Sequence, residues 1–293
     1  SSVIVNATSI TDQPNSLTEV CVDGVAELSV TVADGFGIAE YQWYSNTTNN
    51  NLTGTEITGA TSATYTPDTD SVGTKYYYVE ITQDCGSVVS SVSTVRVVED
   101  PEATISSSDS SLCIGGSIEL SVTTSGGTST PSYQWYYFNI LNPSAVTRIT
   151  GATSATYQTG TELSIKGTYK YYVEVTYDGS GCDLARSNDL EVTVDSVPTL
   201  DNGGDLVDST GAPFLFQEVC EGSILETLYV EVNPSDSGVT EFSYQWYSNT
   251  TDSSLGGTPI SGANASTYTP VTTPVGTTYY YVEVSQSESG CVV

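Results

Sequence analysis

One four-residue pattern, Tyr-Gln-Trp-Tyr, occurs three times in this chain of 293 residues, at 41–44, 133–136 and 244–247. Two other segments recur in step with it. The first begins with Ile and ends with Tyr (57–65, 149–157, 260–268), and the second reads Gly-Thr followed by tyrosines (73–80, 167–174, 276–283). Repetition at such spacings is typical of duplicated domains. The sequence therefore predicts three homologous domains of about 95 residues each.

Each copy consists of short segments in which apolar and polar residues alternate, separated by Gly, Asn, Asp and Pro, as expected for strands. In the first copy the predicted strands are B at 25–32, C at 40–45, F at 75–83 and G at 87–98. A tryptophan in the third strand of such a domain is typical of an immunoglobulin-like sandwich. The expected fold is all-β, with three tandem immunoglobulin-like β-sandwiches in a linear rod.

The aromatic residues of the repeats divide into an inward and an outward set. The position of the tryptophans in strand C favours a core role over sugar stacking, and alternation turns one tyrosine of each strand F inward with them. The expected core residues are Trp43, Trp135, Trp246, Tyr77, Tyr171 and Tyr280. The outward tyrosines are Tyr44, Tyr76, Tyr78, Tyr136, Tyr172, Tyr247, Tyr279 and Tyr281. For these, both cross-strand pairing and contact with a glycan or another filament stay open.

The two ends of the chain complement each other. The third copy stops at Val293, before any strand G, and residues 1–5 occupy the register of a strand G. The expected boundaries are 1–5 for the strand G of a preceding domain, then 6–99, 100–196 and 197–293 for domains 1 to 3, the last without its own strand G. Either a block near 293 residues repeats in a longer chain, which we favour, or separate subunits donate strand G to a neighbour.

Each copy is bracketed by two cysteines, at 21 and 85, 113 and 182, and 220 and 291. Six cysteines in an acidic chain indicate an oxidising location and three disulfides. The antibody positions correspond to Val30 and Val79, and the cysteines are displaced from them toward opposite ends of the domain. A disulfide requires a Cα separation below ~7 Å, whereas at ~3.3 Å per residue the displaced cysteines of one domain would lie tens of ångströms apart. Bridges between domains, Cys21–Cys182 and Cys113–Cys291, are therefore favoured, with Cys85 and Cys220 pairing to neighbouring repeats. Bridges within each domain remain the alternative.

Composition excludes several classes of function. The chain has 6 Lys+Arg against 35 Asp+Glu, a net charge of −29, which repels nucleic acid. It lacks histidine, the usual general base and metal ligand near neutral pH, and no catalytic residue stands out. No apolar run approaches the ~18 residues of a membrane span. We expect no enzyme, no nucleic-acid partner and no membrane insertion in this segment.

Acidic turns are the only metal candidates in the sequence. The run around Asp201, Asp205 and Asp208 lies in an insertion found only in the third copy, and Asp68 and Asp70 form a second cluster. Carboxylate oxygens suit calcium, but neither cluster keeps the spacing of a recognised calcium loop. Both stay weak candidates beside the simpler interpretation as solvated turns.

The motifs Tyr-Gln-Trp, Ile-Thr-Gly-Ala-Thr-Ser, Gly-Thr-x-Tyr-Tyr and Cys182 followed by Ser187-Asn188 resemble the Ig-like repeats of giant Bacteroidota surface proteins, including gliding adhesins exported by the type IX system. The resemblance covers all three repeats. It implies an extracellular, cell-surface attached protein and adds possible O-glycosylation sites at Ser71, Ser196 and Ser209.

The expected function is that of a structural and adhesive filament of head-to-tail Ig-like repeats, mediating surface attachment and, by the resemblance, gliding motility. Its partners would be copies of itself and a substratum or surface glycans. The alternative is a carbohydrate-binding accessory array of a secreted multidomain enzyme. No cofactor is expected in either case.

Overall fold

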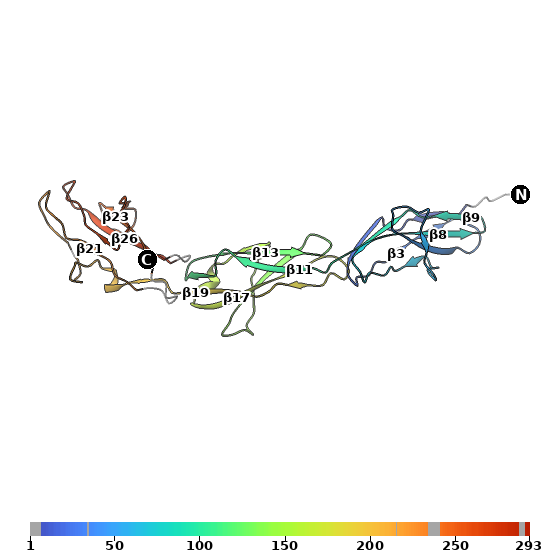
Figure 1. Cartoon of the computed structure of the whole chain (residues 1–293), viewed down its shortest axis with the longest axis horizontal. Helices are drawn as coiled ribbons and strands as arrows, with labels where there is room; N and C mark the ends of the chain where they lie inside the picture. The colour runs from blue at the N-terminus through green and yellow to red at the C-terminus, as the bar shows by residue number, and fades with distance from the viewer. Residues whose placement is uncertain (1–6, 34, 215, 234–240, 287–290) are drawn as a thin grey trace.

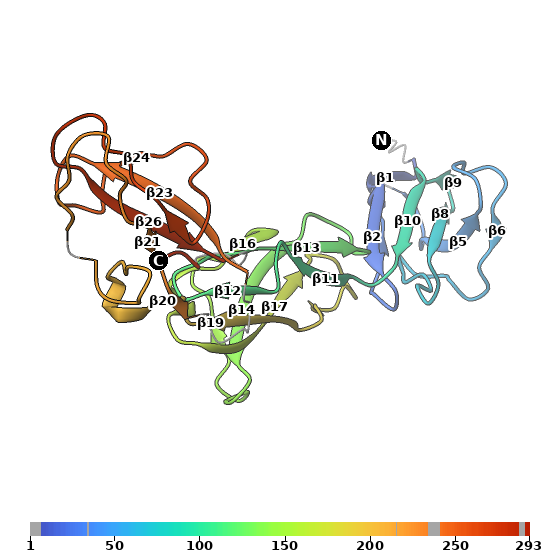
Figure 2. The same ribbon diagram turned by 60° about the vertical axis from the view of Figure 1, so that its left-hand side comes forward.

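The computed structural model describes residues 7–33, 35–214, 216–233, 241–286 and 291–293. Three β-sandwiches follow one another in chain order along the long axis of the molecule (Figure 1). The C-terminal end lies on the side of the third sandwich that faces the second (Figure 2). Residues 1–5, expected to form the strand G of a preceding domain, lie outside the described residues.

The first sandwich consists of two groups of strands. One sheet has the order β2-β10-β8-β5-β6, with β9 also paired to β8, and the opposite layer is formed by the pairs β1-β4 and β3-β7. Its strands are β1 (Ser9–Asp12), β2 (Leu17–Cys21), β3 (Leu28–Ser29), β4 (Thr31–Ala33), β5 (Glu40–Asn46), β6 (Thr55–Glu56), β7 (Thr64–Tyr65), β8 (Gly73–Gln83), β9 (Gly86–Val89) and β10 (Ser93–Val98).

The second sandwich repeats this topology, with the sheets β12-β19-β17-β14-β15 and β11-β13-β16, and β18 paired to β17. Its elements are β11 (Glu102–Ser107), β12 (Ser111–Cys113), β13 (Glu119–Ser125), β14 (Ser132–Asn139), β15 (Thr147–Arg148), β16 (Thr156–Gln158), the 3₁₀ turn η1 (Thr161–Leu163), β17 (Gly167–Thr176), β18 (Ala185–Arg186) and β19 (Leu190–Asp195).

The third sandwich has shorter sheets, β24-β23-β26, β20-β22 and β21-β25. Its elements are β20 (Thr199–Leu200), the 3₁₀ turn η2 (Asp201–Gly204), β21 (Leu228–Tyr229), β22 (Val232–Asn233), β23 (Ser243–Asn249), β24 (Thr258–Pro259), β25 (Thr267–Tyr268) and β26 (Tyr279–Ser285). Within the described ranges the chain has no α-helix, and the all-β prediction is confirmed.

In the first two sandwiches the strand that ends at the first cysteine of the domain runs parallel to the last strand. β2 pairs with β10 and β12 pairs with β19, each time parallel, while β10 and β19 are antiparallel to β8 and β17. A first strand that leaves one sheet and joins the last strand of the other is a known arrangement of immunoglobulin-like sandwiches. The chain is therefore a tandem array of Ig-like domains.

The predicted strand G is broken in two in both complete sandwiches. Residues 90–92 separate β9 from β10, and residues 187–189 separate β18 from β19. At the break a buried serine accepts a hydrogen bond from strand F, with Val79 N donating to Ser90 Oγ and Val173 N donating to Ser187 Oγ, both at 3.0 Å. At this position the serine hydroxyl takes the place of a strand G backbone carbonyl as the acceptor for the N–H of strand F. The expected strand B at 25–32 is likewise split and begins later, as β3 and β4.

The repeated motifs hold strand C to the turn that follows it. Each tryptophan indole donates to a backbone carbonyl, as Trp43 Nε1 does to Ser62 O at 2.9 Å. The preceding glutamine amide donates to the isoleucine carbonyl, as Gln42 Nε2 does to Ile57 O at 2.8 Å. The same two contacts occur in all three sandwiches. They explain why Tyr-Gln-Trp and Ile-x-Gly-Ala recur together.

Replacing Gln42 with leucine is expected to destabilise the first sandwich by about 0.5–1.5 kcal/mol, because it removes the hydrogen bonds from Gln42 Nε2 to Ile57 O and Trp43 O, while Ile57 O keeps the N–H of Ala60 as a donor. Denaturant unfolding of the chain would measure the shift. Thr61→Ala, at an exposed position of the same turn, should leave that transition in place. An equal shift in both variants would contradict the proposed role of the glutamine.

The third sandwich pairs Val293 with Val284 through two backbone hydrogen bonds of 2.9 Å. Val293 thus takes the place that Val88 holds opposite Ile81 in the first sandwich. Cys291 stands two residues before this paired valine, whereas Cys85 stands three residues before Val88, so the two sandwiches differ by one residue in this connection.

Candidate functional site

The first and second sandwiches are joined by a disulfide between Cys21 and Cys182, whose Cα atoms are 4.9 Å apart. Cys21 ends β2 and is fully buried, and Cys182 lies in the connection between β17 and β18. The structure therefore brings together the two cysteines that the sequence favoured as an interdomain pair. The bridge spans the joint rather than one domain core.

Backbone contacts surround this bridge. Cys21 N donates to Ser180 O at 2.9 Å, and Val25 N donates to Ser180 Oγ at 2.8 Å. Val20 and Ser180 form a parallel β-bridge. The loop of the second sandwich thus extends the sheet edge of the first, and satisfied polar groups at the joint fix one relative placement of the two loops.

Two glycines allow this close approach. A Cβ on Gly24 would lie 2.1 Å from the carbonyl oxygen of Ser180, and a Cβ on Gly181 would lie 2.4 Å from the Cα of Gly24. Gly181 also has φ +74°, which side chains with a Cβ rarely adopt. Any side chain at either position would separate the two loops.

The linker between these sandwiches is also held in place. Gly127 N donates to Glu99 O at 2.9 Å, and a Cβ on Gly126 would lie 2.2 Å from Asp100 O. The linker therefore packs directly on the loop between β13 and β14. This joint combines a covalent bridge, hydrogen bonds and a short, packed linker.

The second joint repeats the arrangement. Cys113, at the end of β12, is bonded to Cys291, with Cα atoms 5.1 Å apart, and both are fully buried. Cys85 and Cys220 are exposed and unbonded within the chain. The sequence led us to expect three disulfides, and the chain itself contains two because these cysteines lie on sandwiches that are not adjacent.

The sequence did not single out Ser180, Gly24 or Gly181. A signal was present, because each first cysteine of a domain is followed three residues later by Gly or Ser, at 24, 116 and 223. This spacing forms a tight turn of four residues that begins at the cysteine. The residue two positions after the cysteine has positive φ in each copy, namely Asp23, Gly115 and Gly222. A repeated turn beside a displaced cysteine marks the contact surface.

The expected aromatic core residues lie inside the sandwiches. Trp43, Trp135, Trp246 and Tyr171 are fully buried, Tyr77 is buried, and Tyr280 packs against the third core. In the second sandwich Glu162 Oε1 accepts hydrogen bonds from Tyr157 and Tyr171 at 2.7 and 3.2 Å. Burial, with the Glu162 charge adding to it, raises the pKa of both phenols well above the usual range.

Tyr77 gives the first sandwich a pH limit. Burial raises the pKa of Tyr77 to about 12 from 10.0, so the unfolded chain loses this proton first as the pH rises. The contribution of Tyr77 to the free energy of unfolding is fully present below pH 10, and this free energy falls by about 2–3 kcal/mol between pH 10 and 12. Denaturant unfolding across this range would measure the loss. Tyr77→Phe should reduce the pH dependence, and an unchanged dependence would contradict this assignment.

The outward tyrosines form one stacked pair in each sandwich: Tyr44 with Tyr78, Tyr136 with Tyr172, and Tyr247 with Tyr281, with ring centroids 4.8–5.0 Å apart. Tyr78 and Tyr172 are only 5% and 8% exposed. The phenol oxygens of Tyr78 and Tyr281 each accept a backbone N–H from the loop after strand C, at Gly54 and Gly257. These rings are cross-strand pairs under a loop rather than an open stacking platform.

The other tyrosines of this set are more accessible. Tyr76 is half-buried and Tyr279 is exposed. Arg186 lies 3.8 Å above the Tyr172 ring and also forms an ion pair with Asp189, so a cation already occupies one outward aromatic face.

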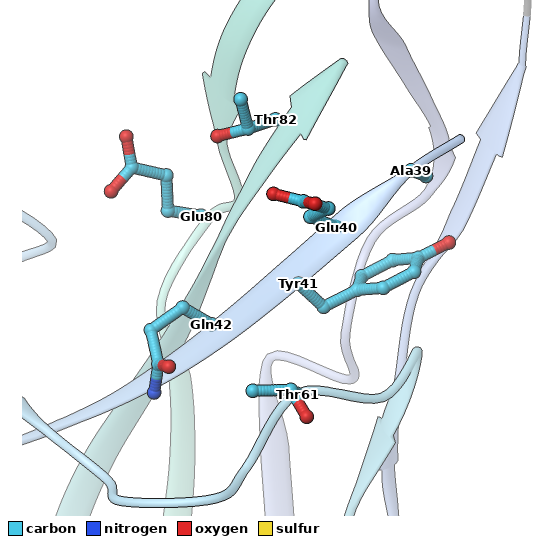
Figure 3. A pocket seen from close by; sticks show the side chains of 7 residues that line it. All are labelled: Ala39, Glu40, Tyr41, Gln42, Thr61, Glu80 and Thr82. Atoms are coloured by element: carbon cyan, nitrogen blue, oxygen red, sulfur yellow. The ribbon is translucent and has the colours of Figure 1, made fainter. Parts of the chain in front are cut away.

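An open hollow of about 500 Å³ lies on the first sandwich (Figure 3). Glu40 and Glu80 extend from the neighbouring strands β5 and β8, with Thr82 beside them; Ala39, Tyr41, Gln42 and Thr61 complete the lining. The two carboxylates can accept hydrogen bonds and would repel an anion, and the three hydroxyls, of Tyr41, Thr61 and Thr82, can accept or donate them. Its lining holds no cysteine, lysine or arginine to act with them in catalysis.

The calcium candidates are not assembled into a site. Asp208 Oδ1 accepts hydrogen bonds from Thr210 and Ala212, which lower the pKa of Asp208, and Asp201 contacts Asn233. Across the part of the chain that the structure describes, no group of three or more Asp, Glu or Cys side chains is placed to hold a metal ion. Asp205 and the pair Asp68 and Asp70 belong to no such group.

The three expected glycosylation serines differ in accessibility. Ser71 and Ser209 are exposed, whereas Ser196 is half-buried. Ser71 Oγ donates to Asp70 Oδ1 at 2.6 Å. Their modification stays a prediction.

The chain belongs to a family described as "Domain of unknown function (DUF8696)", whose model matches residues 7–99 and 102–196. No curated protein matches it. Among the described residues, no helix is long and apolar enough to cross a membrane. The disulfides agree with an oxidising, extracellular location.

Solved structures similar to the chain include Ig domains and a phage capsid protein. The three N-terminal domains of the bacteriophage RB49 highly immunogenic outer capsid protein are 17% identical, with 98% of this chain and 95% of that one covered and a TM-score of 0.49. The four N-terminal Ig domains of Dscam1 isoform 6.9 are 12% identical, with 64% and 46% covered and a TM-score of 0.34. The chain thus spans about half the length of that Dscam1 fragment.

Proposed function

We propose that the chain is a segment of an extracellular filament in which Ig-like sandwiches follow one another head to tail and carry a structural and adhesive role. The observation that supports this most directly is the pair of interdomain disulfides at equivalent positions of successive sandwiches. Bridges of this kind stabilise the spacing and direction of the rod, whereas bridges inside a domain stabilise only that domain. An enzyme or a metal protein is not part of this proposal.

The charge of the chain suits such a filament. A net charge of −29 on 293 residues makes neighbouring rods repel one another, over a distance of ~8 Å at physiological salt. Repulsion between rods favours contact at their ends over bundling along their sides.

The resemblance to Bacteroidota repeats supports the finer part of the proposal, which is attachment to the cell surface and a role in gliding. Under the repeating-block interpretation the filament is one long chain, and under the alternative it is a polymer of subunits whose strand G is donated. Glycans of a substratum are candidate contacts. The buried outward rings of Tyr78 and Tyr172 argue against a carbohydrate-binding array based on these tyrosines.

Immunogold electron microscopy on intact cells of the source organism, with antibody against this chain, tests the proposal. We expect label along filaments outside the cell, and loss of attachment to glass when the gene is deleted. Label confined to the cell interior, or attachment unchanged by deletion, would contradict it. Strong binding of the chain on a glycan array, lost on Glu40→Gln and Glu80→Gln, would favour the carbohydrate-binding alternative.

A further inference from the structure

Every sandwich carries two kinds of cysteine. The first kind stands at the start of the tight turn near the beginning of the domain, and the second kind stands in the F–G connection. At both joints the first kind, Cys21 or Cys113, bonds to the second kind in the next sandwich, Cys182 or Cys291. This rule leaves Cys220, of the first kind, and Cys85, of the second. Because the third sandwich contacts the second through its F–G cysteine, Cys220 lies toward its opposite, free end.

The turn that carries Cys220 already has the conformation of the two bonded turns. Ser223 N donates to Cys220 O at 3.0 Å, as Gly24 N does to Cys21 O at 3.0 Å and Gly116 N to Cys113 O at 2.9 Å. The third residue of each turn has positive φ, with 81° at Gly222. The contact surface at this end is therefore preformed, although Cys220 itself is exposed where its counterparts are buried.

The two free ends differ from the internal joints in two ways that compensate for each other: one end has a larger residue in its turn, and the other has a shorter F–G connection. Ser223 stands where Gly24 packs against the Ser180 carbonyl, so a long F–G loop would collide with its side chain. The F–G turn of the first sandwich is shorter, because Gln83 pairs with Gly86 and only Asp84 and Cys85 lie between them. In the second sandwich the connection from Val175 to Ala185 is longer. The shorter turn leaves room for the serine.

Apolar side chains are exposed around both free cysteines. Beside Cys85, Asp84 N donates to Phe36 O at 3.0 Å, and Phe36 and Ile38 are 63% and 89% exposed. The second sandwich has threonines at the matching positions, 128 and 130. At the other end Ile224 is 92% exposed, four residues after Cys220. Pairing the two ends would remove these side chains from water.

We propose that a second copy of this chain docks the F–G end of its first sandwich on the free end of the third, and that Cys85 of one copy bonds to Cys220 of the other. This inference rests on the filament proposed above and names the chemistry of its joints. Two thiols lose two protons and two electrons to an acceptor disulfide of an extracytoplasmic thiol oxidant, which becomes a dithiol. Each new joint leaves one free cysteine of each kind, so the chain can extend.

The experiment mixes two single variants of the full chain, Cys85→Ser and Cys220→Ser, in the presence of glutathione disulfide as the oxidant. Each glutathione disulfide that accepts the two electrons gives two glutathione molecules. The mixture should yield a covalent dimer joined through Cys85 and Cys220, and each variant alone should stay mainly monomeric. Unmodified chain should form a ladder of oligomers on a non-reducing gel.

A matched control measures non-specific coupling of exposed thiols. It mixes Cys220→Ser with a chain that carries Cys85→Ser, Cys220→Ser and a new exposed cysteine, Ser144→Cys. Docking should make the first pair couple at least about tenfold faster than this control through a higher effective concentration. Equal rates, or dimers mapped mainly as Cys85–Cys85 or Cys220–Cys220, would overturn the joint.

Peptide mapping of the same samples separates this inference from the proposed function. If Cys21–Cys182 and Cys113–Cys291 form and Cys85–Cys220 does not, the end-to-end joint is wrong and the internally bridged rod stands. If the internal bridges also fail to form, the observation that supports the filament proposal is lost.

Discussion

Removing both interdomain bridges should roughly triple the length to which the chain can be pulled. With both disulfides intact, the shortest covalent path runs from the N-terminus to Cys21, crosses to Cys182, returns along the chain to Cys113, and crosses to Cys291. This path contains about 91 residues, or ~330 Å fully extended, whereas the reduced chain reaches ~1,050 Å. The path is short because the covalent loops closed by the two disulfides, 21–182 and 113–291, overlap in sequence.

The effect of the two bridges is not additive. Breaking Cys21–Cys182 alone reroutes the path through Cys113–Cys291 and lengthens it only to ~410 Å, and breaking the second alone gives ~470 Å. Each bridge therefore limits most of the extension when the other is lost. A filament made of such units would resist lengthening even after one disulfide is reduced.

Single-molecule force spectroscopy with handles at the two ends measures these lengths. The variants are Cys21→Ser with Cys182→Ser, Cys113→Ser with Cys291→Ser, and the combination of all four. All of them also carry Cys85→Ser and Cys220→Ser, so that no free thiol remains to attack a disulfide. The background itself should extend no further than the unmodified chain. A background that extends by roughly another 490 Å would indicate bridges inside the first and third domains instead.

The Cys21–Cys182 bridge also stabilises the first sandwich against unfolding. Cys21–Cys182 closes a loop of 161 residues, and when the first sandwich alone unfolds the closed loop still contains most of that domain. Chain-entropy reasoning gives a stabilisation of about 4–5 kcal/mol for a loop of this length. Thermal unfolding of the Cys21→Ser variant should show the first sandwich melting well below its usual temperature.

Local sequence patterns were enough for the class of fold and for the inward aromatic residues. Strand alternation and a tryptophan in strand C are properties of a few consecutive residues, and the repeats supplied three independent copies. The displacement of Cys21 from the antibody position followed from counting along one strand. It required no knowledge of how the domains meet.

The features that the sequence did not reveal depend on contacts between distant segments. Tyr78 alternates outward, yet the loop at Gly54 covers it, and periodicity cannot report a loop that folds back. The break in strand G depends on Ser90 binding Val79 across the sheet. The acidic turn at Asp201 and Asp208 satisfied a composition rule for calcium, but its carboxylates are used by neighbouring backbone and side-chain groups.

Replacing Gly24 with valine should break the non-covalent contact between the first two sandwiches without unfolding either. A Cβ there would lie 2.1 Å from Ser180 O, a backbone atom that cannot move aside without shifting its loop. The hydrogen bonds from Cys21 N and Val25 N to Ser180 lie at the same place and would be lost with it. Gly24 lies outside both hydrophobic cores, so those cores should remain intact.

Small-angle scattering would show the change as a broad distribution of interdomain angles in place of one extended shape. The disulfide Cys21–Cys182 should become easier to reduce, by at least about tenfold in the thiol concentration required, because opening the joint strains and exposes it. Unchanged scattering and reduction would contradict the close approach of Gly24 and Gly181 as the basis of a rigid joint.

Ser223→Val is the matched control for this change. Ser223 holds the same turn position in the third sandwich, is exposed, and closes its turn with the same backbone hydrogen bond to Cys220. In the monomeric chain the valine should leave shape and reducibility unchanged, because no second sandwich contacts that turn within the described residues. In the mixed oxidation experiment it should slow the coupling of Cys85 to Cys220, since the short F–G turn leaves room for serine but less for a branched side chain. One substitution type at two equivalent positions thus separates the internal joint from the joint between copies.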